Sequence, residues 1–200
     1  MIRYVRMVTA PAVEPVTIDE ARLWCRIDAD DATQDAMLQL LIIAMREHAE
    51  AITGRAFASR TLEFVMDAFP PDDEPIELPY PPLASVSYIT YVDASGADQT
   101  MGGSPDAFLV DTASYPGRLT PLFAGTWPAI RDQIGAVRIG YVAGYATTNL
   151  IPKALRVWMQ ARIATIFENR EHLVMNNMVE IPRDFADGLL DSLRVRVMFS

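Results

Sequence analysis

The strand-forming segments of this sequence lie together in its middle, between helical segments at both ends. Residues 59–146 contain short runs in which apolar and polar side chains alternate, separated by turn residues, and these runs predict about six strands. Apolar residues recur at three- and four-residue steps on either side of this region, which predicts helices. Strands that do not alternate with helices exclude a doubly wound nucleotide-binding sheet. The expected fold is α+β, a small helical bundle from the N- and C-terminal segments with an inserted antiparallel β domain.

Three parts follow from this order. Residues 1–58 are expected to be the N-terminal helical part of the core, 59–146 the inserted β domain, and 147–200 the C-terminal helices and a tail. The stretch from Pro70 to Pro82 holds six prolines. Because proline cannot donate a ladder hydrogen bond, this stretch must run along a sheet edge or in a loop.

Two helices are predicted before the strands. Thr17 and Glu20 have the spacing of a capping box, which starts a short helix. A long amphipathic helix follows, which Asp30, Asp31 or Thr33 can cap and which a glycine ends. Its expected apolar face consists of Met37, Leu40, Leu41, Ala44, Met45, Ala49 and Ile52.

The net charge of −9 is concentrated in the middle of the chain. Residues 61–135 hold eleven acids and only two arginines. An acidic surface repels phosphate and gives no support to nucleic-acid affinity. It is either an ordinary solvated face or a surface that lies near DNA without binding it. The strongest acidic candidates for such a channel or surface are Asp72, Asp73, Glu74 and Glu77.

The single cysteine and the lack of long apolar runs bear on disulfide formation and on the cellular compartment. The single cysteine, Cys25, excludes an internal disulfide and is expected to be a small core residue. The N-terminal residues contain no long apolar run and predict no secretory signal, and no stretch is long enough for a membrane helix. The chain is therefore expected to be soluble and cytoplasmic.

The segment "GYVAGYATTNLIPKALRVW", residues 140–158, tests whether a phosphate loop is present. It lacks the second glycine followed by lysine and a hydroxyl residue that a phosphate loop needs. Gly140 and Gly144 are expected to relieve crowding or bend a strand. Pro152 is compatible with the first turn of a helix. The segment is interpreted as a structural corner.

Metal and catalytic sites are not predicted. The acids of residues 28–35 resemble a calcium loop, but threonine and glutamine stand where such a loop needs glycine and glutamate. Neither His48 nor His172 has a neighbour that suggests a metal pair, and no nucleophile–base arrangement occurs. We expect no enzyme activity, no metal and no cofactor.

The C-terminal segment carries an apolar stripe with arginines beside it. The stripe either packs on the protein's own core or inserts into a groove of another subunit. Its members are Phe185, Leu189, Leu190, Leu193 and Val197, flanked by Arg194 and Arg196.

Taken together, several segments resemble the head–tail connector (adaptor) proteins of long-tailed bacteriophages and gene transfer agents. The matching pieces stand in the family's order over nearly the whole chain, and they are structural rather than catalytic. They are "PVTIDEARLWCRID", "DDATQDAMLQLLIIAMREHAEAITGRAF", "RTLEFVMDAFP", "IELPYPPLASVSYITYVDASG", "YPGRLTP", "VRIGYVAGY" and "IPKALRVWMQARIATIFENRE".

The resemblance implies a non-enzymatic subunit of a ring, usually of twelve copies, beneath the capsid portal in the neck of a virion or virus-like particle. Such a ring is assembled in the bacterial cytoplasm and extends the channel for double-stranded DNA without sequence-specific binding. Its implied partners are the portal protein, copies of itself, and a stopper or tail protein, with no membrane. Portal binding is carried onto residues 183–200, with Phe185, Leu189, Leu190, Leu193, Arg194 and Arg196 as the candidate contacts.

Two other functions stay open at the level of the sequence. One is a small-molecule enzyme whose site forms only in three dimensions, for example around His48. The other is a monomeric peptide-binding β module that uses the edge near the proline-rich stretch.

Overall fold

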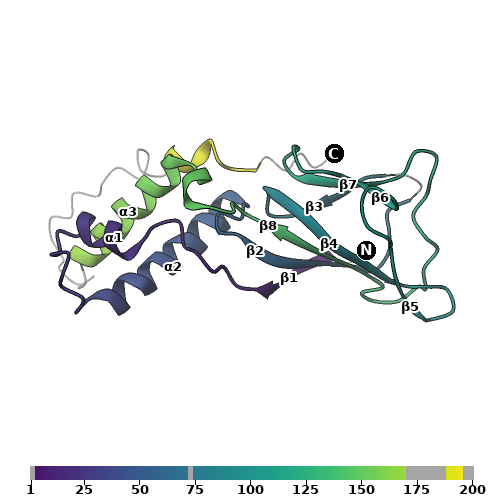
Figure 1. The fold of residues 1–200 in the computed structure, drawn as a ribbon, viewed down its shortest axis with the longest axis horizontal. Helices are drawn as coiled ribbons and strands as arrows, with labels where there is room; N and C mark the ends of the chain where they lie inside the picture. Colours follow the sequence, from purple (N-terminus) through teal and green to yellow (C-terminus); the bar gives the residue numbers. More distant parts are fainter. Residues whose placement is uncertain (1–2, 72–73, 170–187, 196–200) are drawn as a thin grey trace, which may run out of the picture. The chain divides into compact units, whose positions relative to one another are not determined.

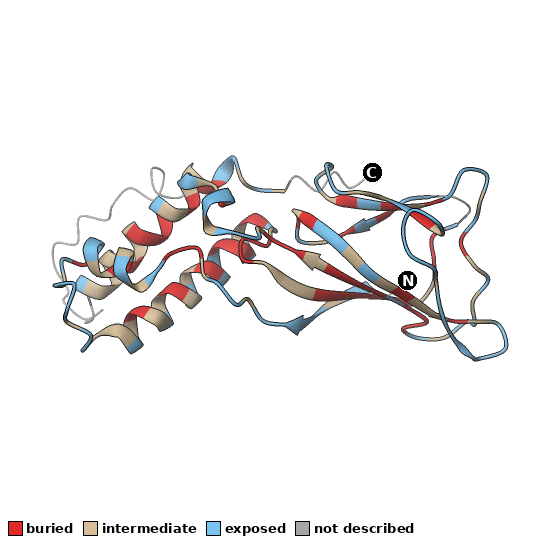
Figure 2. Ribbon diagram, viewed as in Figure 1, coloured by how far each residue is buried: buried red, intermediate tan, exposed pale blue. Residues whose placement is uncertain are grey.

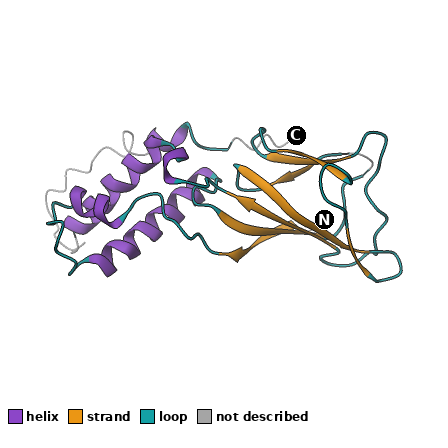
Figure 3. Ribbon diagram, viewed as in Figure 1, coloured by secondary structure: helices purple, strands orange, loops and turns teal. Residues whose placement is uncertain are grey.

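The chain forms two compact units, each assembled from segments that are distant in the sequence. The strand unit consists of Met1–Ala12 and Ala58–Ala146, and the helical unit of Val13–Phe57 and Thr147–Ser200. Among the described residues, all strands lie in the first unit and all helices in the second (Figure 3). The predicted α+β class is therefore confirmed. The structure, a computed structural model, describes residues 3–71, 74–169 and 188–195.

The helical unit contains three named α-helices among the described residues. They are α1 (Ile18–Trp24), α2 (Asp35–Thr53) and α3 (Lys153–Glu168), with a short 3-10 helix, η1 (Thr148–Leu150), before α3. α2 packs against α3, and α1 contacts both of them (Figure 1). None of the described helices is long and apolar enough to span a bilayer.

The ends of these helices follow local rules with one exception. The capping box at the start of α1 is present, because the Thr17 side chain accepts from the Glu20 amide and the Glu20 carboxylate accepts from the Thr17 amide. α2 ends at Gly54, which has the left-handed φ of 69° that favours glycine. The predicted cap of α2 by Asp30, Asp31 or Thr33 is wrong: its N-cap is Gln34, without a side-chain hydrogen bond. The Asp31 carboxylate instead accepts from the Thr33 amide in a preceding turn.

The predicted apolar face of α2 is also wrong in its rotation about the helix axis. Leu40, expected in the core, is 66% exposed, and Ala44 is exposed as well. The buried positions repeat at three- and four-residue steps from a different start, and two of them carry charged side chains. They are Leu38, Ile42, Arg46, Ala49, Glu50 and Thr53. Because the buried stripe includes the ion pair between Arg46 and Glu50, the spacing of apolar residues alone does not identify it.

The described residues of the strand unit form eight strands in two antiparallel sheets, whose strands are labelled in Figure 1. The five-stranded sheet has the order β1-β2-β8-β4-β5, and the three-stranded sheet has the order β3-β7-β6. The five strands of the larger sheet are β1 (Arg3–Thr9), β2 (Arg60–Met66), β8 (Val137–Ala143), β4 (Leu83–Val92) and β5 (Asp98–Thr100). The three strands of the smaller sheet are β3 (Ile76–Leu78), β7 (Gly117–Pro121) and β6 (Phe108–Asp111).

Two of these strands lie outside the expected set. The sequence predicted no strand before residue 59, yet β1 pairs with β2 along its whole length. β3 forms inside the proline-rich stretch and takes an edge of the smaller sheet, as the lack of ladder donors in that stretch requires. β1 is also an edge strand, and it is exposed over nearly all of its length (Figure 2).

The core of the strand unit lies between the inner faces of the two sheets. Leu83 of β4 lies so close to Gly117 of β7 that a Cβ on this glycine would stand 2.5 Å from the leucine Cβ. The Tyr141 hydroxyl donates to the Pro79 carbonyl just after β3, and its burial raises the pKa of this tyrosine. A second cluster stacks Trp127 on Phe69, with ring centroids 5.1 Å apart.

Candidate functional site

The candidate tail contacts are divided between described and undescribed residues. Phe185 and Arg196 lie outside the described residues. Residues 188–191 are helical, Leu190 is fully buried, and the Val195 amide donates to the Thr53 carbonyl at the end of α2. One member of the stripe is thus part of the helical unit's own core. Leu189 and Leu193 are half-buried, and Arg194 is exposed and paired with Asp191.

The candidate acidic surface is partly covered by arginine. Asp72 and Asp73 lie outside the described residues, and Glu74 is exposed in the loop before β3. Glu77 is exposed on β3, opposite Arg118 of β7 in the sheet register. Arg118 in turn lies opposite Asp111 of β6, and its guanidinium contacts that carboxylate at 2.8 Å. The smaller sheet therefore presents a cross-strand row of two acids and one arginine rather than bare acid.

Other acids of the middle region hold turns together. The Asp93 carboxylate accepts from the Ser95 hydroxyl at 2.6 Å, from the Gln99 side chain at 2.8 Å, and from the Ala97 amide at 3.0 Å. These hydrogen bonds to the charged form lower the pKa of Asp93 to about 2. A hydrogen bond from Arg118 and amides of the following turn likewise lower the pKa of Asp111 to about 2. Two of the eleven acids of residues 61–135 thus form local hydrogen bonds that hold turns.

The two glycines of the sequence segment 140–158 have the structural roles that were predicted. Gly140 lies under the ring of Tyr88, and a Cβ there would stand 2.2 Å from a ring carbon. Gly144 has φ +99°, and a Cβ would stand 2.4 Å from the Ala58 carbonyl oxygen. The prediction of a structural corner is therefore confirmed.

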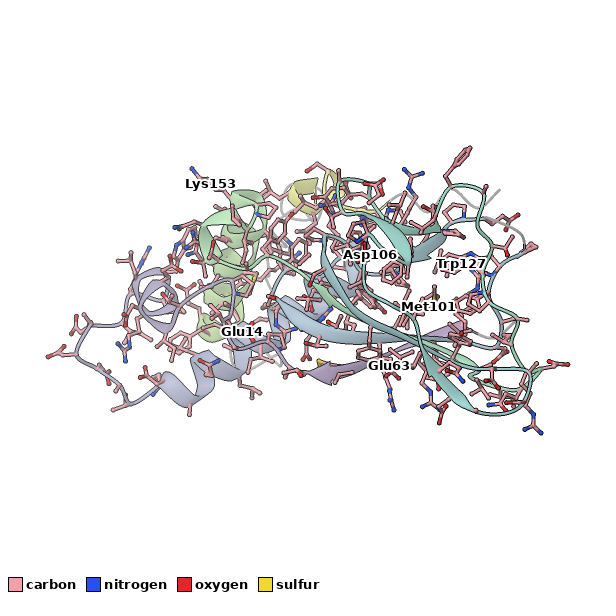
Figure 4. All side chains as sticks on the ribbon, turned by 45° about the vertical axis from the view of Figure 1, so that its right-hand side comes forward. Glu14, Glu63, Met101, Asp106, Trp127 and Lys153 are labelled. Atoms are coloured by element: carbon pink, nitrogen blue, oxygen red, sulfur yellow. The ribbon has the colours of Figure 1, made fainter. Side chains whose placement is uncertain are left out.

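The space above Gly140 allows a polar row to cross four strands. In register, Arg6, Glu63, Gly140 and Tyr88 follow one another across β1, β2, β8 and β4. The Tyr88 hydroxyl donates to Glu63 at 2.7 Å, and Arg6 pairs with the other oxygen of Glu63 at 2.7 Å. The hydrogen bond to Glu63 raises the pKa of Tyr88. The Glu63 side chain, labelled in Figure 4, is 5% exposed.

A buried charge cluster of the helical unit lies near two of the three points at which the chain passes between the units. Arg46 of α2 binds Glu14 and Glu50, each at 2.8 Å. The second oxygen of Glu50 accepts from the Phe57 amide at 2.8 Å. Glu14 stands just after one crossing, and Phe57 stands just before the next. The sequence analysis does not predict this cluster, because Arg46 and Glu50 are charged and so are not part of the apolar pattern used to identify the buried face of α2.

Metal-binding groups and reactive side chains give no site within the part of the chain that the structure describes. No group of three or more His, Cys, Asp or Glu residues is placed there to hold a metal ion. Cys25 is buried, as expected of a small core residue. His48 stacks on Trp158 of α3, with ring centroids 5.9 Å apart. His172 lies outside the described residues.

Two exposed features were not predicted. β1 presents Tyr4, Met7 and Val8, each at least half exposed, along an open sheet edge. Its sequence "RYVRMVT" is rich in β-branched and aromatic residues, and this strand signal could have identified it. Phe123 is 99% exposed in a tight turn, which the Gly125 amide closes by donating to the Leu122 carbonyl.

Comparisons with known proteins agree with this architecture. Residues 15–93 match the family model described as phage gp6-like head-tail connector protein. A search of curated proteins finds no match.

Three solved structures share the fold. One is a chain in "Neck of empty GTA particle computed with C6 symmetry", with a TM-score of 0.78, 24% identity and 98% of each chain covered. A second, in "Virion of native gene transfer agent (GTA) particle", has a TM-score of 0.77, the same identity and the same coverage. A third, in "Neck of native GTA particle computed with C12 symmetry", has a TM-score of 0.63 and 23% identity, with 97% of this chain and 99% of that chain covered. The resemblance to head–tail connector proteins that the sequence predicts is confirmed by the family model over residues 15–93. Over nearly the whole chain, the fold is shared with a chain from the neck of a gene transfer agent particle.

Proposed function

We propose that this chain is a structural, non-enzymatic head–tail connector (adaptor) subunit. Twelve copies form a ring under the portal in the neck of a virion or virus-like particle, and the ring extends the DNA channel and joins head to tail. The observation that carries the proposal is the shared fold, which covers 98% of this chain and 98% of a chain from a gene transfer agent neck. The family model over residues 15–93 supports the same role independently.

The proposed partners are the portal protein, further copies of the chain, and a stopper or tail protein. Double-stranded DNA passes through the ring without sequence-specific binding. The acidic balance of residues 61–135 supports this, because a negatively charged surface facing the channel repels the phosphate backbone. Exposed Glu74 and Glu77, with Asp72 and Asp73, are the proposed channel or surface acids.

Portal binding is proposed for the C-terminal tail, with Phe185, Leu189, Leu193, Arg194 and Arg196 as contacts; Leu190, also a candidate contact from the sequence, is fully buried and is not proposed to touch the portal. The burial of Leu190 separates its proposed role from that of the exposed residues of the tail. Leu190 anchors the base of the tail in the helical unit, and residues with exposed surface, such as Arg194, are available to the portal.

The test mixes the protein with the portal ring encoded beside it and examines the product by sedimentation and electron microscopy. Stacked rings with the full chain, and none after truncation at Pro182, are expected. Since the truncation also removes buried Leu190, Arg194→Glu provides a milder variant, because this side chain is exposed. Lys153→Glu is the matched control, since Lys153 is exposed at the start of α3 and its side chain points away from the helix (Figure 4).

The variants distinguish portal binding by the tail from the adaptor function as a whole. Stacked rings with Lys153→Glu but not with Arg194→Glu support portal binding by the tail. Stacked rings with both variants and with the truncation contradict the tail assignment but leave the adaptor function standing. No association of the full chain with an intact portal ring contradicts the adaptor function itself.

A further inference from the structure

The larger sheet of the strand unit has two open edges of different character. β1 forms one edge and β5 the other. Among the described residues, no strand pairs with the outer side of either one. An exposed edge presents a row of backbone donors and acceptors to which another chain can add a strand. β1 spans seven residues, contains no proline, and exposes apolar side chains beside that row.

The charges of the two edges are opposite. β1 carries Arg3 and Arg6 and no acid, and β5 begins with exposed Asp98. Like charges placed opposite one another destabilise a strand pair, and opposite charges stabilise it. Pairing β1 with β1 would bring arginines together, and pairing β5 with β5 would bring aspartates together. The charges therefore favour contact of β1 with β5.

The side chains that would meet lie on the same face of the sheet. Arg6 stands in the cross-strand row that includes Gly140 of β8. Thr100 of β5 pairs with Thr90, which pairs with Arg138, two residues from Gly140 and thus on the same face. Asp98, two residues from Thr100, shares this face. Arg6 already pairs with Glu63, but its side chain is 60% exposed and its guanidinium has donors for a second carboxylate.

Strand direction determines which symmetry such a contact can build. Every neighbouring pair in the five-stranded sheet is antiparallel, so β1 and β5 run in the same direction. Copies related by rotation about one axis then bring β5 of one copy beside β1 of the next in parallel. This contact joins two different surfaces, as the closed ring of the proposed function requires, whereas a twofold dimer joins identical surfaces.

We propose that β1 of each subunit pairs in parallel with β5 of its neighbour, so that the larger sheets continue from copy to copy around the ring. This inference rests on the proposed ring. Its occupant is a second copy of this chain, and Arg6 of one copy and Asp98 of the next form the charged contact.

Crosslinking on assembled portal rings tests the contact. Two variants, Val8→Cys on β1 and Thr100→Cys on β5, are mixed on the portal ring and treated with a short bismaleimide, because Val8 stands beside Thr100 when parallel strands place Arg6 beside Asp98. A covalent dimer is expected from the mixture and from neither variant alone, because only unlike edges meet. The unmodified chain, whose single Cys25 is buried, is the blank. A chain that carries both Thr90→Cys and Thr100→Cys, which face each other within one sheet, is the positive control.

Charge reversal gives a second test. Asp98→Arg is expected to lower the fraction of portal rings that carry the protein about tenfold or more, since like charges across an interface cost more than one decade of affinity. Asp106→Arg makes the same charge change at an exposed position outside both edge strands, in the loop before β6, and is expected to leave assembly unchanged.

The outcomes separate this inference from the function on which it rests. Rings that assemble without the mixed crosslink, while the positive control reacts, overturn the edge contact and leave the adaptor function standing. Crosslinks formed by either variant alone also overturn it, because they show like edges in contact. If the unmodified chain does not assemble on the portal ring, the proposed function fails and the edge contact fails with it.

Discussion

Arg46 and Glu50 lie one helical turn apart on α2 and form a buried ion pair, 2.8 Å between Nη1 and Oε2. Each residue is 4% exposed. Because Arg46 also binds Glu14, and Glu50 also accepts from the Phe57 amide, the pair connects α2 to two segments that lead into the strand unit. A pair of this kind is costly to break, since the remaining partner stays buried and charged.

Arg46→Ala is expected to lower the free energy of unfolding by about 3–5 kcal/mol, because two carboxylates lose their buried counter-charge. Urea denaturation followed by circular dichroism measures the change. Arg194→Ala, which breaks an exposed pair with Asp191, is the matched control and is expected to change stability by less than about 1 kcal/mol. Equal effects of the two substitutions would contradict a stabilising role for the buried pair.

Gly140→Ala is expected to destabilise the larger sheet by about 1–3 kcal/mol, because the added Cβ overlaps the Tyr88 ring. Gly103→Ala is the control, since a Cβ there has no heavy atom within 4 Å. A double-mutant cycle identifies the cause: in a Tyr88→Leu background the cost of Gly140→Ala should fall. An unchanged cost would show that the tyrosine ring is not what requires glycine.

Acidification is expected to loosen the turn between β4 and β5 over a defined pH range. The pKa of Asp93 is lowered to about 2 in the folded protein, whereas an aspartate in an unfolded chain has a pKa of about 3.9. The stability that its charged form provides is therefore fully present above about pH 4 and is lost as the pH falls toward 2. Hydrogen exchange at the Ala97 amide, which donates to Asp93, reports the loss.

The matched variants for this pH dependence are Asp93→Asn and Asp106→Asn. Asp93→Asn should make the Ala97 amide exchange faster near neutral pH and remove the acid-dependent change. Asp106→Asn should leave both unaltered. An NMR titration that gave Asp93 an ordinary carboxyl pKa would contradict the lowered pKa on which the prediction depends.

Leu190→Ala is expected to lower the unfolding free energy of the helical unit by about 2–5 kcal/mol, because this side chain is fully buried. Leu150→Ala is the control, since Leu150 is 62% exposed and its truncation should change stability by no more than about 0.5 kcal/mol. Thermal or urea unfolding distinguishes them. A stability unchanged by Leu190→Ala would show that the base of the tail is not part of the core.

Local signals in the sequence determined much of this fold. The capping box at Thr17, the glycine at position 54 and the six expected strands all depend on contacts between residues close in the chain or on alternation within one segment. The same holds for the confinement of the proline-rich stretch to a sheet edge, because it follows from the missing amide donor of proline itself.

The errors of the sequence reading have physical causes of a different kind. Leu40 is predicted to be buried because it is apolar, and no burial is predicted for Arg46 because it is charged. The carboxylates that stabilise Arg46 in the core come from positions 14 and 50, and only folding brings both to it. Strand β1 carries a local strand signal in its β-branched and aromatic residues, but its pairing with β2, more than fifty residues away, is decided only in the tertiary structure.

The sequence by itself determined the class of fold, the order of its elements and the resemblance to head–tail connector proteins, since these depend on local patterns and on their succession. Only the tertiary structure decided which residues meet. It placed β1 and β5 at opposite edges of one sheet, it buried Leu190, and it put Tyr88 over Gly140. Strand order, register and helix rotation are set by the packing of segments distant in the chain, and no local pattern specifies that packing.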